Sequence, residues 1–141
     1  MAAAVAVLVS LNGCVSSEST VQSRFAILSE EATAEDRLPV EPNDGAYDAV
    51  DGESARYGGE AAGVRLWIAV GTGTSSVCVV VVPENPALTV VGCGGDVMVG
   101  RGEEQLKVMP NAGPVVHLLV DGDPQVDTTA WEQVSENLWV E

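Results

Sequence analysis

The three cysteines are the residues in this sequence with the widest range of possible chemistry. Cys14 follows an apolar N-terminal run, whereas Cys78 and Cys93 flank a segment rich in valine. A cysteine can act as a nucleophile, bind a metal, carry a lipid or form a disulfide. Zinc sites need ligands in closely spaced pairs, and three cysteines with the single His117 do not supply them. The sequence therefore points to lipidation and disulfide formation.

The segment before Cys14 is typical of a signal peptide. The run from Ala2 to Leu11 is almost entirely apolar, but a membrane-spanning helix needs roughly 20 such residues. A shorter run fits the apolar region of a leader. The motif LNGC resembles the lipobox of bacterial lipoproteins in Leu11, Gly13 and Cys14, with Asn12 where Ala or Ser is commoner. The resemblance implies that Cys14 receives a diacylglyceryl group and becomes the first residue of the mature chain.

Two interpretations of this segment stay open. No basic residue precedes Arg24, although secretory leaders begin with positive charge. Either translation starts further upstream, or residues 2–11 form a buried strand or helix of the domain. On the lipoprotein interpretation, residues 1–13 are the signal peptide, 14–22 are a lipid-anchored tether and 23–141 are a single domain. This predicts a protein held by its N-terminal lipid on the extracytoplasmic face of the cell membrane.

The segment VCVVVVPENPALTVVGC predicts a hairpin that brings two cysteines together. β-Branched residues lie on both sides of the turn former PENP. If Val82 faces Thr89 across the turn, then Cys78 faces Cys93 in the same register. A disulfide is therefore predicted, as an oxidising exterior would favour. Two buried free thiols in a cytosolic protein are the alternative.

Short β-branched runs separated by turn residues continue from Gly52 to the C-terminus. Strands about 8 to 14 residues apart, with no helix between them, predict antiparallel pairing rather than βαβ units. The predicted fold class is mainly β (α+β), with one antiparallel sheet of short strands and a disulfide-linked hairpin. One short N-terminal helix is expected within FAILSEEATAEDRLP, capped by Ser29 and ended before Pro39. The strand VCVVVV is apolar on both faces, so we expect it to be central and covered on both sides.

The chain is strongly acidic, with 21 acidic against 6 basic residues and a net charge of −15. Such a charge repels phosphate backbones, so no binding to nucleic acid is expected. Acidic residues gather in residues 43–53 and in DGDPQVD, where Asp121, Asp123 and Asp127 could bind a cation such as calcium. Neither segment has EF-hand spacing, and Asp-Gly pairs also form ordinary turns. A cation site stays an alternative, and no cofactor is predicted.

One histidine and three tryptophans could contribute to a catalytic or sugar-binding site. His117 lies between apolar residues in a predicted strand, which would turn its ring towards solvent. The sequence assigns it neither a nucleophile nor an orienting acid, so we do not expect an enzyme. Trp67, Trp131 and Trp139 could stack on sugars, but in a chain with few aromatics we expect them to be core or strand-covering residues.

Several stretches resemble small surface lipoproteins and secreted proteins of high-GC Gram-positive (actinobacterial) bacteria. The resemblance is carried by Phe25, DRLP at Asp36–Pro39, ESAR at Glu53–Arg56, Trp67, SSVCVVVV, GCGG around Cys93, LLVDGD and SENLWV. The LLVDGD segment lacks the proline that relatives tend to have there. The resemblance implies export, a disulfide between Cys78 and Cys93 and a small, mainly β domain, and it brings no catalytic residues.

These observations predict a membrane-anchored extracytoplasmic domain with a binding or structural role at the cell envelope. Its expected partner, besides the membrane, is an envelope protein or glycan. An ion- or ligand-binding module that uses the acidic loops is one alternative. A small envelope enzyme with a site assembled from scattered residues is the other.

Overall fold

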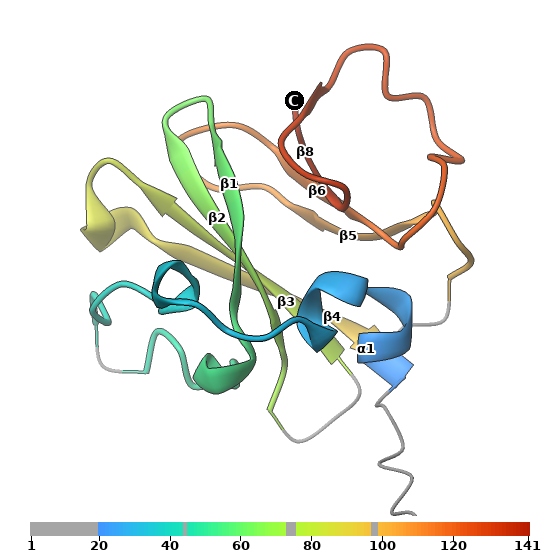
Figure 1. The fold of residues 1–141 in the computed structure, drawn as a ribbon. Helices are drawn as coiled ribbons and strands as arrows, with labels where there is room; N and C mark the ends of the chain where they lie inside the picture. Colours follow the sequence, from blue (N-terminus) through green and yellow to red (C-terminus); the bar gives the residue numbers. More distant parts are fainter. Residues whose placement is uncertain (1–19, 44, 73–75, 97–98) are drawn as a thin grey trace, which may run out of the picture.

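The fold consists of two four-stranded antiparallel sheets (Figure 1). The computed structural model describes residues 20–43, 45–72, 76–96 and 99–141, and the predictions for the signal peptide and Cys14 lie outside them. The first sheet has the order β1 (Arg56–Ala61), β2 (Val64–Val70), β3 (Ser76–Pro83) and β4 (Val90–Asp96). The second has the order β5 (Glu104–Val108), β6 (Val116–Leu119), β8 (Leu138–Val140) and β7 (Glu132–Gln133).

The prediction of a mainly β, antiparallel fold is confirmed, but the prediction of a single sheet is wrong. The strands after β4 pair with one another and not with the first sheet. Val108, Val116 and Leu138 each belong to the apolar face of the second sheet, and they join the core of the first. Because an apolar sheet face must be buried against another layer, the two sheets pack face to face.

The helical segments are short. The prediction of one short N-terminal helix is confirmed, but its predicted position between Phe25 and Pro39 is wrong. The only α-helix in the described residues is α1 (Thr20–Arg24). It is followed by the 3-10 turns η1 (Ala26–Ser29), η2 (Ala34–Asp36), η3 (Gly52–Ser54) and η4 (Pro86–Leu88).

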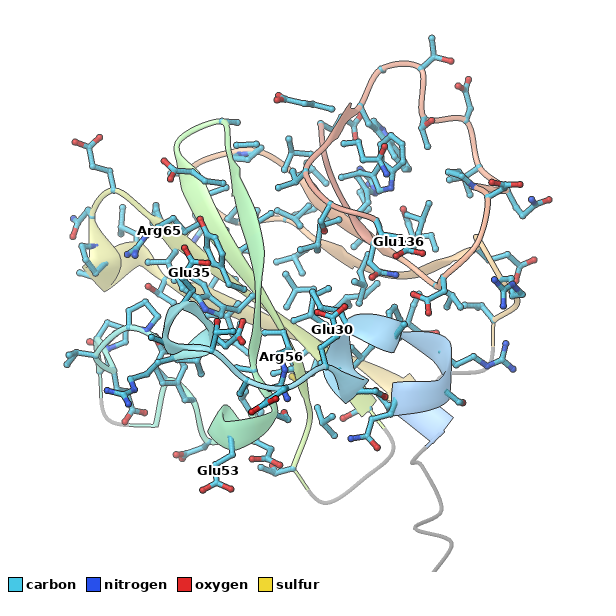
Figure 2. The ribbon with its side chains drawn as sticks, in the orientation of Figure 1. Glu30, Glu35, Glu53, Arg56, Arg65 and Glu136 are labelled. Atoms are coloured by element: carbon cyan, nitrogen blue, oxygen red, sulfur yellow. A yellow bond between two sulfur atoms is a disulfide. The ribbon has the colours of Figure 1, made fainter. Side chains whose placement is uncertain are left out.

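Tertiary contacts explain why the predicted helix does not form. Glu30 and Thr33 have extended backbones between the turns η1 and η2. The carbonyl oxygen of Glu30 accepts two hydrogen bonds from the guanidinium of Arg56, at 3.0 and 2.6 Å, and Figure 2 shows the two residues side by side. A helix would need that carbonyl for its own ladder, so the contact with β1 replaces it.

The cysteine hairpin has the predicted register. Cys78 in β3 is the direct partner of Cys93 in β4, and Val80 is the partner of Val91. The two sulfurs form a disulfide. The prediction of a disulfide-linked hairpin is therefore confirmed.

Strand β3 is the centre of the core, as its apolar sequence predicts. Val77, Val79 and Val81 face the second sheet and the N-terminal turns, within one apolar cluster. Cys78 and Val80 face the opposite side, in a second cluster that the loop before β1 covers. Burying one valine side chain contributes roughly 1.5 kcal/mol or more, so a strand buried on both faces stabilises both layers at once.

The start of the described chain is packed against the domain. Val21, which the sequence assigned to the tether, and Phe25 are fully buried. In Figure 1, α1 lies low on the right, well away from the C-terminus near β8 at the top. None of the helices in the described ranges is long and apolar enough to span a membrane.

Candidate functional site

The three aspartates of the DGDPQVD segment are not brought together. Asp121 follows β6 and is a structural residue, because its Oδ2 accepts a hydrogen bond from the Ala26 N–H at 2.8 Å. Its Oδ1 accepts a second one from the buried Asn137 amide, also at 2.8 Å. The Asp121 N–H in turn donates to the carbonyl of Arg24 at 3.1 Å. Asp121 thus ties α1 and η1 to the second sheet.

Asp127 caps a local turn further along the same loop. Its Oδ1 accepts hydrogen bonds from the hydroxyl of Thr129 at 2.5 Å and from the Thr129 N–H at 3.0 Å. These two bonds lower the pKa of the Asp127 carboxyl. Across the described ranges, no group of three or more His, Cys, Asp or Glu side chains could hold a metal ion. Asp123 makes no such cluster with its neighbours.

The densest group of polar and aromatic side chains lies on the outer face of the second sheet. His117 in β6 and Trp139 in β8 alternate with residues of the inner core, so both point to this outer face. They are cross-strand partners. Lys107 of β5 is the partner of His117 on its other side.

His117 is buried, and the prediction that its ring faces solvent is wrong. The residue is 1% exposed. Its Nδ1 lies 2.5 Å from Glu104 Oε2, and its Nε2 lies 2.9 Å from Glu141 Oε2. The ring of Trp131 stacks on the imidazole, with 3.7 Å between the centroids and 12° between the planes.

The reason for the burial is the loop between β6 and β7, residues 120–131. Periodicity within one strand assigns a side chain to a face, but it does not say what covers that face. Here Trp131, at the end of the loop, covers the ring of His117. The run of three apolar residues Leu118, Leu119 and Val120, all buried, is a signal in the sequence that both faces are covered at this point.

A hollow of about 540 Å³ lies beside this cluster, and Trp139 is one of the residues that line it. Loop residues 122–124 line one part of it, and the side chains of Arg101, Gln133 and Glu136 line the rest. Figure 2 labels Glu136 on the side of the molecule away from Arg65. Within the part of the chain that the structure describes, the side chains of Arg101, Gln133 and Glu136 have no hydrogen-bonding partner.

The indole N–H of Trp139 is buried without a hydrogen-bond acceptor. The residue as a whole is only 9% exposed. Buried donors in native proteins are nearly always paired, and each exception needs an explanation. Trp139 is also one of the residues that line the hollow.

Trp67 has a different environment, in the first sheet. Its Nε1 donates to the carbonyl of Glu35 at 3.3 Å. The guanidinium of Arg65 lies over its ring, 5.4 Å from the centroid, and Tyr57 meets it edge-on at 5.2 Å. Trp67 is therefore a satisfied core residue, and the three tryptophans do not form one platform.

Comparison of the chain with protein-family models, with curated proteins and with solved structures finds no match.

Proposed function

We propose that this chain is a lipid-anchored extracytoplasmic domain that binds a glycan of the cell envelope. The location follows from the expected lipid on Cys14. The bridge between Cys78 and Cys93 supports it, because structural disulfides persist mainly in oxidising compartments. The net charge of −15 fits a domain that stays soluble and separate at a surface.

Binding fits the outer face of the second sheet better than catalysis does. A general base needs a nitrogen that can take a proton from the substrate. Both ring nitrogens of His117 already contact carboxylates. Its contacts in the described residues include no hydroxyl or thiol that could act as a nucleophile.

The unpaired indole N–H of Trp139 is the observation that carries the proposal. Around it, Arg101 offers only donors, Glu136 only acceptors and Gln133 both. A pyranose ring carries several hydroxyls, each of which can donate and accept. It also has an apolar face that can lie against an indole. A saccharide therefore matches every group in the hollow, which a simple anion or cation would not.

Titration with defined saccharides tests the binding role. We would record saturation-transfer NMR and calorimetry with three soluble probes: a tetramer of N-acetylglucosamine, maltotetraose and a mannose tetramer. We expect at least one of them to bind. Trp139→Phe keeps a ring in place but removes the N–H, and it should weaken binding by about tenfold, the value of one buried hydrogen bond.

Trp67→Phe is the matched control, because it makes the same change at an indole that already has a partner in the fold. It should leave the affinity for the saccharide unchanged. Failure of all three probes to bind, or an equal loss of affinity in the two variants, would contradict a glycan site at Trp139.

The mass of the N-terminal peptide tests the location. We would isolate the protein from the membrane fraction of its source and sequence its first peptide by mass spectrometry. A peptide that begins at Cys14 and carries the mass of a diacylglyceryl group is the expected result. An unmodified chain that retains residues 1–13 in the soluble fraction would rule out the anchor.

A further inference from the structure

Glu104, Glu141 and Trp131 contact the ring of His117, and we call this group of contacts the clasp. The contacts with the two glutamates depend on the protonation state of the ring. A neutral imidazole has one N–H donor and one bare nitrogen, whereas an imidazolium has two donors. Nδ1 and Nε2 each face a carboxylate oxygen, at 2.5 and 2.9 Å. Only the imidazolium satisfies both contacts. In the neutral ring, one lone pair faces a negatively charged oxygen at hydrogen-bonding distance.

The charged groups on the elements around the ring are mostly acidic. The elements packed around it contribute Glu104 and Lys107 from β5 and Glu141 after β8. Two carboxylates, one ammonium and one imidazolium sum to zero, and loss of the proton leaves a net negative charge. The adjoining loop and β7 add only acidic side chains: Asp121, which accepts from Ala26 and Asn137, and the exposed Asp123, Asp127 and Glu132.

The clasp joins two parts of the chain that border the hollow. Trp131 stacks on the imidazole and ends the loop of residues 120–131. Residues 122–124 of the same loop line the hollow. Glu141 follows β8, which carries Trp139, another residue that lines that hollow.

We propose that His117 is a pH-sensitive clasp that closes the loop of residues 120–131 against the second sheet when it is protonated and releases it when it is neutral. The regulation of binding that follows rests on the proposed glycan site. The clasp itself does not, because it is defined by contacts within the chain. At acidic pH the wall of the hollow is fixed, and as the pH rises the wall loosens.

His117 is the only histidine in the chain, so its Hε1 resonance can be followed by NMR without assignment to other sites. The first experiment records this resonance and the thermal unfolding midpoint at the same series of pH values. The protonated ring has two carboxylate acceptors only in the folded state. We therefore expect the midpoint to fall with rising pH across the range in which the resonance titrates. A midpoint that does not change across that range would overturn the proposal.

Variants of the two glutamates separate the clasp from the general effect of pH. Glu104→Gln combined with Glu141→Gln keeps the size of both side chains and removes the charges that hold the proton. The double variant should lose the slope of the midpoint against pH. Glu132→Gln, which changes an exposed side chain on β7, should keep it. A slope that persists unchanged in the double variant would refute the clasp.

Amide hydrogen exchange measures directly whether the loop of residues 120–131 opens. The amide of Trp131 donates to the carbonyl of Thr128 within the loop, and the amide of Gln125 donates to the carbonyl of Gly102, just before β5. After correction for the intrinsic effect of pH, their exchange should accelerate by about tenfold as His117 loses its proton, the effect of losing one charged hydrogen bond. Amides of β3 should not change. Equal behaviour of both sets of amides would show that no local release occurs.

The saccharide titration distinguishes the failure of this proposal from the failure of the binding site. One outcome is that no saccharide binds, while the thermal unfolding midpoint and the amide exchange rates respond to pH as expected. This outcome would support the clasp and contradict the glycan site. If a saccharide binds with an affinity that is independent of pH over the titration of His117, the clasp does not regulate that site and the proposal falls.

Discussion

Cys78 is fully buried in β3, whereas its disulfide partner Cys93 lies at the surface of β4. The bridge therefore fixes the central strand of the core to the last strand of the first sheet. Val80 and Val91 pair two residues further along, so bridge and strand pairing hold the same register. The turn between the two strands has its own local support, because the Asn85 side chain accepts a hydrogen bond from the Ala87 N–H at 3.1 Å.

Removal of the disulfide should destabilise the fold without changing it. The bridge spans a sequence separation of 15 residues, and closing a loop of that length is worth about 3 kcal/mol in the chain-entropy model. Cys78→Ala combined with Cys93→Ala should lower the free energy of unfolding by this amount in urea titrations. Wild-type protein treated with a reductant is the control and should approach the curve of the variant. Identical curves with and without reductant would contradict the prediction.

Asp36 should make the free energy of unfolding depend on pH in the acidic range. Burial alone would raise the pKa of its carboxyl. Hydrogen bonds from the N–H groups of Thr33 and Tyr57 and from the Thr33 hydroxyl, together with the positive charge of Arg56, outweigh that effect and lower the pKa. The pKa of Asp36 is lower in the folded chain than in the unfolded chain. The ionised carboxylate therefore stabilises the fold at pH values above the ordinary pKa of an aspartate. That stability is lost as the pH falls from about 4.

Asp36→Asn tests this dependence. The amide cannot accept at all the positions that the carboxylate serves, so at neutral pH we expect a loss of about 1 to 3 kcal/mol. The difference from wild type should shrink as the pH falls below 4. Asp48→Asn, at an exposed carboxylate, is the matched control and should cost little at any pH. A difference for Asp36→Asn that is constant from pH 7 to pH 2 would show that its charge does not matter.

Gly102→Ala should displace the wall of the hollow. Gly102 has a φ of +75°, and an added Cβ would overlap the backbone carbonyl of Asp123. The left-handed backbone and the overlap together should cost at least about 2 kcal/mol. Gly63→Ala is the matched control, because its φ of +78° imposes the same backbone strain with no atom within 4 Å of the added Cβ. The excess cost of Gly102→Ala over Gly63→Ala in chemical denaturation measures the clash.

Asp121→Ala should loosen the start of the domain. The substitution leaves the Ala26 N–H without its acceptor and removes one of the two acceptors of the Asn137 amide, which keeps the Leu119 carbonyl. Loss of an acceptor costs about 1 to 3 kcal/mol at the buried Asn137 amide and less at the exposed Ala26 N–H, which water can reach. We expect faster hydrogen exchange at Ala26 and a lower melting temperature. Asp123→Ala, in the same loop, should leave the exchange of Ala26 unchanged. An effect of equal size in both variants would mean that the loop as a whole, and not this carboxylate, holds the N-terminal turns.

The sequence predicts the first sheet better than the second because the first sheet depends on local pairing. Alternation of valines on both sides of one turn is enough to set Cys78 opposite Cys93. The outer face of the second sheet depends instead on residues that are far apart in the chain. His117 meets Glu104, Trp131 and Glu141 only after three strands and a long loop have folded. Strand periodicity contains no information about such a loop.

The wrong position of the predicted helix, between Phe25 and Pro39, also results from contacts between residues that are far apart in the chain. The composition of Ser29–Asp36 favours a helix, but Leu28 must be buried in the core at one end, and Asp36 must reach the N–H of Tyr57 in β1 at the other. Two short turns joined by an extended segment meet both requirements. Long-range contacts therefore override the local preference.

If the domain is anchored as proposed, the hydrogen bonds of Asp121 with Arg24 and Ala26 set the path of mechanical load. Tension that enters the chain ahead of Thr20 would first reach Val21 and Phe25, which are buried between the layers. It would then pass through the bonds of Asp121 with Arg24 and Ala26 into the second sheet. The disulfide of the first sheet lies off this path. Drag on a tethered molecule would thus strain the loop beside Trp139 before it strained the cysteine hairpin.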